Sequence, residues 1–285
     1  MGVFSGIWIP LVTPFTHGAV DHDALRRLVK RYADAGVSGI VALGTTGEPA
    51  SLSESEQDEV LATILGAATG LPIVAGVAGN SLARSTERVE YLSETPVAGI
   101  LISPPYYIRP SQAGIVDYFT RLADTSTKPI VLYEIPYRTG VRIEIETLLR
   151  LAAHPRIQAI KDCAGSLETT LALIGDGRLR VLAGDDINIF TTLCLGGNGG
   201  ILATAHIRPD LFVAMYHAVA GGRLEEGRKI FRELVPIIQA LFSEANPGPV
   251  KAALALEGLI HDELRPPMTR ATEVFWKRWR QLTVG

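Results

Sequence analysis

Short apolar segments recur along the chain, and each is followed by turn residues and then by a segment with helical periodicity. Most of the apolar segments are nearly continuous rather than alternating, which is typical of parallel strands covered by helices. We therefore predict eight strands, at residues 7–13, 39–44, 73–77, 99–104, 129–135, 157–162, 181–186 and 199–204.

The segments between these strands carry helix start and stop signals. In residues 21–36, apolar side chains recur at helical spacing, Asp21 is placed to cap the start and Gly36 to end the helix. Ser53 followed by Glu56 is a capping box, which predicts a second helix start. Comparable helical patterns cover residues 81–94, 111–125, 144–153, 166–174, 187–194 and 208–220.

This regular alternation of strand and helix predicts an α/β protein of the (β/α)8 TIM barrel type. An open, doubly wound sheet is the competing arrangement, but eight regular units favour a closed barrel. The chain changes character after residue 222, because the remaining segments have helical patterns only. We therefore expect a catalytic barrel at residues 1–222 and a C-terminal helical extension at residues 223–285.

The composition agrees with a single globular domain of barrel size, with 285 residues, 47% of them hydrophobic and 20% charged. The net charge is −3 and no basic stripe is present, so nucleic-acid binding is not expected. Two cysteines are too few for a disulfide framework. With neither a signal-peptide pattern nor an apolar run of about 18–20 residues, we expect a cytoplasmic protein without a membrane anchor.

In a (β/α)8 barrel, reactive side chains gather where the strands end, and Lys161 lies at the end of the sixth predicted strand. Burial disfavours the charged form of an amine, so its pKa falls and neutral amine becomes available. A neutral lysine attacks carbonyl groups to form a Schiff base. The ordinary alternative is a lysine that reaches solvent or pairs with Asp162 or Asp185.

Three other strand ends supply polar groups at the same rim. Tyr133 ends the preceding strand, and its hydroxyl is either a proton carrier beside the amine or a hydrogen-bonded core group. Thr45 and Thr46, in the sequence GTTGE, form either a carboxylate cradle or simply a tight turn. Arg138, in YRTG, either binds a second carboxylate through both its nitrogens or stands exposed in a loop.

Other features argue against cofactors. The glycine-rich run at residues 196–200 precedes a predicted strand, so it is expected to be a tight turn at the opposite rim rather than a phosphate loop. The six histidines lack the spacing of metal ligands, and no G-x-G-x-x-G nucleotide fingerprint is present. We expect neither a metal nor an organic cofactor.

Taken in order, the motifs GTTGE, PPYYIRP, LYEIPYRTG, IKDCAG, GDD and NPGPVKAAL resemble those of one family. This family is the dihydrodipicolinate synthase and N-acetylneuraminate lyase superfamily of Schiff-base-forming, class I pyruvate aldolases. The resemblance covers residues 4–275 and is closest to the dihydrodipicolinate synthases. It implies a lyase that condenses pyruvate with aspartate 4-semialdehyde in lysine biosynthesis, without a metal or cofactor.

The resemblance also assigns roles to residues. Lys161 would form the Schiff base with pyruvate, while Tyr133, Thr45 and a Tyr107 donated by a neighbouring subunit would carry protons. Thr46 would hold the pyruvate carboxylate and Arg138 the carboxylate of the aldehyde. The remaining pocket residues would be Gly184, Asp185 and Ile201. A tyrosine shared between subunits implies a tight dimer, and the family is commonly a homotetramer built as a dimer of dimers.

Several positions depart from the family pattern. Glu134 stands where asparagine is common, Tyr137 is bulkier than usual, and residues 162–164 differ from the usual sequence after the lysine. Glu134 and Tyr137 are therefore candidate specificity residues. Of the positions that match the lysine feedback site, Asn80 and Tyr106 are retained, but others differ. Arg84 replaces a glutamate that binds the amine of lysine, so we expect weak or absent inhibition by lysine.

These departures keep two alternatives open. One is a related pyruvate-dependent lyase or dehydratase that acts on a 2-keto-3-deoxy sugar acid, which Glu134 and Tyr137 favour and Arg138 disfavours. The other is a barrel that binds a ligand or regulates without catalysis. It is disfavoured by the presence of four residues: Lys161, Tyr133, Thr45 and Tyr107.

Overall fold

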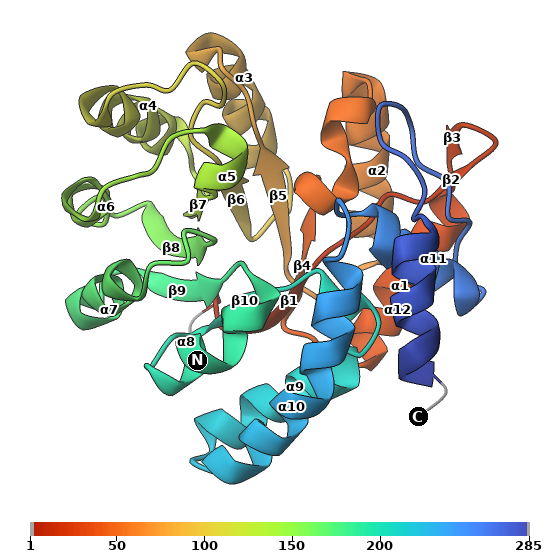
Figure 1. Ribbon diagram of the computed structural model, residues 1–285. Coiled ribbons are helices and arrows are strands. Elements are labelled where there is room, and N and C mark those ends of the chain that lie inside the picture. The colour runs from red at the N-terminus through yellow and green to blue at the C-terminus, as the bar shows by residue number, and fades with distance from the viewer. Residues whose placement is uncertain (1–2, 284–285) are drawn as a thin grey trace. The chain divides into compact units, whose positions relative to one another are not determined.

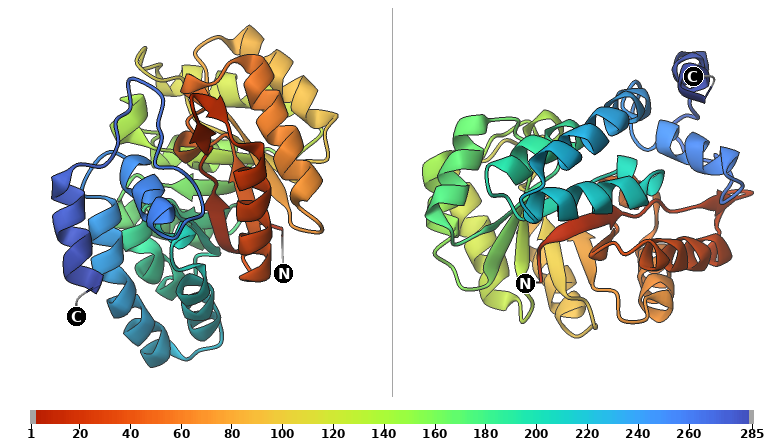
Figure 2. Two further views of the ribbon diagram at one scale, coloured as in Figure 1. Left: turned by 90° about the vertical axis from the view of Figure 1, so that its right-hand side faces the viewer. Right: turned by 90° about the horizontal axis from the view of Figure 1, so that it is seen from below.

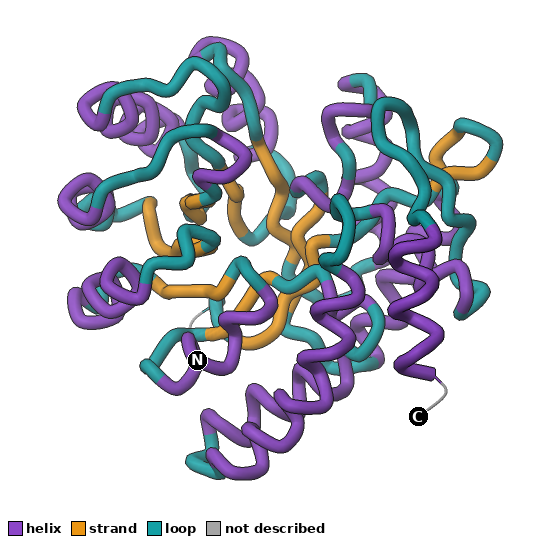
Figure 3. The backbone as a smooth tube through the Cα atoms, in the orientation of Figure 1, coloured by secondary structure: helices purple, strands orange, loops and turns teal. Residues whose placement is uncertain are grey.

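The computed structural model describes residues 3–283 and contains a closed barrel of eight parallel strands in the order β1-β10-β9-β8-β7-β6-β5-β4. The predicted barrel is confirmed, and the open sheet is excluded. Figure 3 separates these strands from the helices by colour. The barrel strands are β1 (Gly6–Pro10), β4 (Gly39–Ala42), β5 (Ile73–Val77), β6 (Gly99–Ile102), β7 (Ile130–Glu134), β8 (Ile157–Asp162), β9 (Arg180–Ala183) and β10 (Gly199–Ile201).

Contacts between residues divide the described chain into two compact units, 3–6 with 72–201 and 7–71 with 202–283. In the first unit, parallel pairing links β5 to β6, β6 to β7, β7 to β8, β8 to β9 and β9 to β10. Helices alternate with these strands and lie on their outer side (Figure 1). These helices are α3 (Leu82–Ser93), α4 (Gln112–Thr125), α6 (Ile145–Leu151), α7 (Leu167–Asp176) and α8 (Ile189–Cys194).

In the second unit, β1 pairs with β4, with Trp8 opposite Gly39. This unit also contains a short antiparallel pair, β2 (Phe15–Thr16) and β3 (Ala19–Val20). Strands of two residues are too short to be predicted from periodicity. Helices α9 and α10 pack side by side, as both views of Figure 2 show. The helices of this unit are α1 (His22–Asp34), α2 (Glu54–Ala67), α9 (Pro209–Ala220), α10 (Leu224–Leu241), α11 (Gly248–Leu256) and α12 (Glu273–Thr283).

The predicted helix caps are confirmed. The Asp21 carboxylate accepts a hydrogen bond from the Ala24 N–H at 2.8 Å, and Ser53 and Glu56 form both bonds of the capping box. Gly36 adopts a left-handed φ of 74° just after α1, where other residues would be strained. No helix among residues 3–283 is long and apolar enough to cross a membrane.

The glycine-rich run at residues 196–200 is the tight turn that its position predicts. Asn198 bonds Val181 twice, through its backbone N–H at 2.8 Å and its side-chain oxygen at 2.9 Å. Gly199 has a φ of 153°, and a Cβ there would overlap the backbone of Gly6. These glycines therefore allow close packing at the start of β10 and do not form a ligand loop.

Several strands end earlier than their apolar segments suggest. Residues 184–186 follow β9 instead of extending it, and Thr45–Gly47 after β4 is a 3-10 turn. A four-residue helix, α5 (Pro136–Thr139), follows β7 where no helix was predicted. Proline at its first turn and Gly140 with a φ of 78° at its end are the signals that fit this helix. These turns carry most of the predicted site residues.

Candidate active site

Lys161 and Tyr133 lie side by side on adjacent strands. They are register partners between β8 and β7, and the Lys161 Nζ is 4.3 Å from the centre of the Tyr133 ring. Alternation along β8 gives the direction of the lysine, because the next residue, Asp162, bonds Thr170 on the outer helix α7 at 2.8 Å. Lys161 therefore projects to the opposite face of the strand, the interior of the barrel.

The Lys161 side chain is buried, and burial is the largest cause of a pKa below the usual lysine value. The Cys163 thiol and the carboxylates of Asp186 and Asp185 oppose this shift, while the Arg138 guanidinium adds to it. Neutral amine is therefore available at lower pH than for a solvated lysine. Such an amine is the nucleophile that Schiff-base chemistry requires.

Asp162 does not act as the ion-pair partner of Lys161. One of its carboxylate oxygens accepts the Ala164 N–H at 2.9 Å, and the other accepts the Thr170 hydroxyl. Both oxygens are thus used on the outer side of β8. The strand-end lysine is a buried group facing the barrel interior rather than a cation that Asp162 holds.

Asp185 and Cys163 lie beside the lysine. Burial raises the pKa of Asp185, and hydrogen bonds from the Cys163 thiol and the Tyr137 hydroxyl partly oppose that rise. Gly184 makes this packing possible, because a Cβ there would overlap the Cys163 sulfur and lie 2.9 Å from the Lys161 Cγ. Sequence reasoning missed Cys163, which directly follows β8; its place two residues after the lysine was a usable signal, because alternate residues of an extended chain share a face.

Tyr137 and Arg138 lie on α5, directly beyond the end of β7 (Figure 1). The Arg138 guanidinium is 5.9 Å from the centre of the Tyr137 ring, so the two side chains lie together. The Tyr137 side chain is largely exposed, and its hydroxyl donates a hydrogen bond to the Asp185 carboxylate. The short helix therefore places a cation and a phenol close to the end of β7.

Tyr107 stands in a strained and open segment. Its φ is 70°, its side chain is 87% exposed, and its backbone N–H donates to the Thr139 carbonyl at 3.0 Å. A bulky residue with a positive φ is uncommon and persists only where its surroundings fix it. Tyr106 and Ile108 on either side are exposed as well, so the segment presents apolar surface.

Glu134 faces away from Lys161. Its register partner is Asp162, whose side chain points toward the helices, and its Oε1 accepts the Ile143 N–H at 3.0 Å. The carboxyl group is fully buried, and burial is the main cause that raises its pKa to about 7. Ile201, another of the residues predicted to line the pocket, ends β10 and is buried.

Thr45 and Thr46 lie in the second unit, on the 3-10 turn that follows β4. The Thr46 hydroxyl is buried and accepts a hydrogen bond from the Asn246 side-chain amide at 2.9 Å. The next residue after the turn, Glu48, has a φ of 53° and forms a buried ion pair with Lys251 on α11. The segment NPGPVK, which sequence reasoning used only as a family marker, thus fixes the threonine turn.

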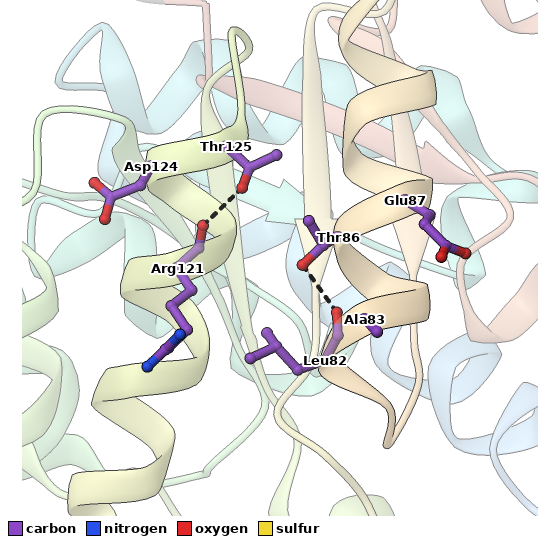
Figure 4. Close-up of a pocket in the computed structure, with 7 residues that line it drawn as sticks. All are labelled: Leu82, Ala83, Thr86, Glu87, Arg121, Asp124 and Thr125. Carbon is purple, nitrogen blue, oxygen red and sulfur yellow. Dashed lines mark hydrogen bonds between the residues drawn. The ribbon is translucent and has the colours of Figure 1, made fainter.

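An outer groove between α3 and α4 has a volume of about 570 Å³ (Figure 4). Its charged groups are mostly engaged, since Arg121 pairs with Asp117 at 2.9 Å and Asp124 with His154 at 3.0 Å. None of the predicted site residues lines it; its lining is Leu82, Ala83, Thr86, Glu87, Arg121, Asp124 and Thr125. Among residues 3–283, no cluster of His, Cys, Asp and Glu is arranged to hold a metal ion.

Comparison with known proteins gives consistent matches. The family model described as the dihydrodipicolinate synthetase family matches residues 3–281. The chain is 39% identical to the 4-hydroxy-tetrahydrodipicolinate synthase of Syntrophus aciditrophicus, covering 95% of this chain and 94% of the relative. The enzyme of the same name from Trichlorobacter lovleyi is 40% identical, with 93% of each chain covered.

Solved structures agree with the sequence matches. The lysine-bound dihydrodipicolinate synthase of Cyanidioschyzon merolae superposes with a TM-score of 0.96 at 32% identity. The match covers 100% of this chain and 98% of the other.

Proposed function

Because this chain belongs to the dihydrodipicolinate synthetase family, we propose that it condenses pyruvate with L-aspartate 4-semialdehyde to give 4-hydroxy-tetrahydrodipicolinate in lysine biosynthesis. The observation that carries this proposal is the buried Lys161, stacked on Tyr133 at the end of β8 with a lowered pKa. Buried neutral lysine is the usual nucleophile toward a 2-keto acid. The reaction class is that of a Schiff-base lyase.

In the proposed reaction, the Lys161 amine adds to the keto carbon of pyruvate and water leaves, giving a protonated imine. The imine accepts electrons when a methyl proton is removed, and the resulting enamine carbon attacks the aldehyde, whose oxygen gains a proton. The amino group of the semialdehyde then attacks the imine carbon, which closes the ring and releases Lys161. The proton carriers in this proposal are Tyr133, Thr45 and Tyr107 of a neighbouring subunit.

Substrate binding is assigned to groups at the carboxyl ends of the strands. Thr46 is proposed to donate a hydrogen bond to the pyruvate carboxylate. Its hydroxyl oxygen accepts a hydrogen bond from Asn246, so the hydroxyl proton is left to bind the substrate, which supports this role. Arg138 is proposed to bind the carboxylate of the semialdehyde through two nitrogens. Gly184, Asp185 and Ile201 complete the pocket, with no metal or organic cofactor.

The contact between Tyr137 and Asp185 supports a second candidate function. A phenol and a carboxylate beside Lys161 add donors and acceptors that suit a substrate rich in hydroxyl groups. The alternative is therefore a related pyruvate lyase, or a dehydratase, acting on a 2-keto-3-deoxy sugar acid. Its aldehyde partner would lack the carboxylate contact with Arg138 that the synthase reaction uses.

Turnover with a panel of aldehydes tests these two functions against each other. We expect pyruvate consumption to be faster with aspartate 4-semialdehyde than with sugar-acid aldehydes. Arg138→Ala is expected to raise the KM for the semialdehyde by about 30-fold or more, since it removes a charge-assisted pair, while adduct formation with pyruvate persists. Faster turnover of a sugar-acid aldehyde, unaffected by Arg138→Ala, would support the alternative instead.

We also propose a cytoplasmic homotetramer, built as a dimer of dimers. Two exposed apolar surfaces support it: residues 106–108 around Tyr107, and Leu167 with Leu171, which lie four residues apart on α7. Neither Cys163 nor Cys194 forms a disulfide bond in the described part of the chain, as is usual in a reducing compartment. Sedimentation that shows a fully active monomer would exclude the shared Tyr107.

The division into a catalytic barrel at 1–222 and a helical extension at 223–285 remains part of the proposal. Its support is that α10, α11 and α12 follow one another without a strand. Asn246 and Lys251 of this extension hold the threonine turn, so the extension serves the site as well as the fold.

L-Lysine is expected to inhibit the enzyme weakly or not at all. The Asn80 side-chain oxygen accepts a hydrogen bond from the Tyr106 N–H at 2.9 Å. The neighbouring helix α3 carries Arg84, whose positive charge repels the ammonium group of lysine. An inhibition curve with L-lysine measures this directly. Arg84→Glu is the matched variant and is expected to increase sensitivity, whereas strong inhibition of the wild type at sub-millimolar lysine would contradict the prediction.

A further inference from the structure

The segment that follows β7 carries two of the proposed substrate contacts and is held at both ends. It comprises α5 and residues 140–143. At its start, the Ile135 carbonyl accepts the N–H groups of Arg138 at 3.0 Å and Thr139 at 3.1 Å. The Thr139 carbonyl in turn accepts the Tyr107 N–H. The position of this segment therefore determines where the Arg138 guanidinium and the Tyr107 backbone lie.

The far end of the segment is fastened to β7 by the side chain of Glu134. Its Oε1 accepts the Ile143 N–H at 3.0 Å, in a buried contact. Arg142, one residue earlier, donates to the Ala164 carbonyl at 3.0 Å, and its own carbonyl accepts from Gln112 at 2.8 Å. The segment thus spans from the end of β7 to a point on the outer side of the same strand.

The second oxygen of this carboxyl group is unusual. Glu134 is fully buried, and its Oε2 has no hydrogen-bond partner among residues 3–283. The charged groups that face Glu134 are Asp162, on β8, and Arg142, on the segment itself. The Asp162 carboxylate is its register neighbour, so a second negative charge at Glu134 is repelled at close range.

We propose that Glu134 is a positioning residue that fixes the 136–143 segment while its carboxyl group is neutral, and that ionisation loosens this attachment and weakens binding of the aldehyde substrate. The proposal rests on the proposed function, because it assigns Arg138 to the carboxylate of that aldehyde. Glu134 acts through the segment and touches no reacting atom.

The sign of the pH effect follows from the raised pKa of about 7, caused mainly by burial and opposed by the Ile143 N–H and Arg142. Below this pH the carboxyl group is protonated, and Oε1 accepts the Ile143 N–H without an unpaired buried charge. Above it, the anion has an unpartnered oxygen beside Asp162, which draws in water or the Arg142 guanidinium. The Ile143 N–H and Arg142 by themselves favour the anion, but loosening of the segment hydrates the carboxylate and removes the larger cost of its burial, so attachment weakens as the pH rises through about 7.

Glu134→Gln separates the charge from the hydrogen bond. Glutamine keeps an oxygen for the Ile143 N–H and places an amide donor toward Asp162, but it cannot ionise. Between about pH 6 and 8.5, we expect the KM of the wild type for the aldehyde to increase by a factor roughly tenfold larger than the increase in E134Q. This factor corresponds to the free energy of one buried hydrogen bond. Trapping of pyruvate on Lys161 is expected to show no such difference, because Lys161 faces the other side of the sheet.

Hydrogen exchange tests the attachment without relying on turnover. After correction for the intrinsic effect of pH, amides of residues 140–144 are expected to lose protection in the wild type above pH 7 but not in E134Q. Glu134→Ala is expected to leave them poorly protected at both pH values. Equal pH profiles for the wild type and E134Q in both measurements would overturn the proposal.

The same experiments keep the two proposals apart. No turnover of aspartate 4-semialdehyde, together with pH-dependent protection of residues 140–144, would reject the synthase function and leave the attachment by Glu134 standing. Turnover of the semialdehyde, together with identical protection and KM profiles for the wild type and E134Q, would support the synthase function and reject the attachment by Glu134.

Discussion

Replacing Lys161 with methionine is expected to abolish covalent trapping of pyruvate and to lower kcat by roughly 10⁴-fold or more, the scale seen when a covalent nucleophile is removed. The amine is the group in the Lys161–Tyr133 pair that can form an imine, and it is buried at 4.3 Å from the tyrosine ring. Methionine keeps the length and apolar character of the side chain. The measurement is borohydride reduction with pyruvate, followed by mass spectrometry of the labelled peptide.

The control for this experiment is folding. Burial disfavours the charged amine, so Lys161→Met removes a destabilising group and is expected to leave the unfolding midpoint no lower than that of the wild type. Lys161→Arg retains a cation without a nucleophile and should trap no pyruvate either. A wild-type protein that gives no adduct would reject both proposed enzymatic functions and favour the barrel that only binds, whereas an adduct on another lysine would reject the role of Lys161.

Breaking the ion pair between Lys251 and Glu48 is expected to destabilise the protein by about 3–5 kcal/mol. The Lys251 side chain is fully buried; its Nζ also donates to the Glu263 carbonyl at 2.9 Å and lies 4.2 Å from the centre of the Phe15 ring. Lys251→Met leaves the Glu48 carboxylate buried without its main cation. Burial already raises the pKa of Glu48, and losing Lys251 is expected to raise it further.

A matched surface pair shows whether burial causes this effect. Lys30 and Asp34 form an ion pair at 2.9 Å with both side chains exposed, so Lys30→Met is expected to change stability by less than about 0.5 kcal/mol. Glu48→Gln combined with Lys251→Met should cost less than the sum of the single changes. Denaturant unfolding at one protein concentration measures all four variants. Equal effects at the buried and exposed pairs would contradict the prediction.

The barrel and the buried lysine at the end of one of its strands were predictable because their signals are local. Eight apolar segments in alternation with helices indicate a barrel, and the carboxyl ends of barrel strands share one rim. A lysine at such a strand end is unusual enough to be noticed, and the structure confirms its burial and its contact with Tyr133. The order of strands and helices likewise placed the glycine-rich run at 196–200 before a strand, at the end opposite to the one that carries reactive side chains.

Other features were hidden because they depend on what packs against what. The sequence placed Glu134 next to Tyr133 and therefore near the site, but alternation along β7 turns its side chain to the helix-covered side. The support of Thr46 by Asn246 joins residues 200 positions apart. No periodicity within a window of residues reports such a contact.

The sequence by itself determined the strand and helix pattern, the barrel and the position of a lysine at the end of a barrel strand, because each follows from local apolar periodicity or from the end of a strand. Tertiary structure alone decided the electrostatics, since a pKa depends on burial and on neighbours from distant segments. It lowered the pKa of Lys161, raised that of Glu134 to about 7, and enclosed Lys251 with Glu48. The physical reason is that desolvation is a property of the packed interior, which no single segment of the chain contains.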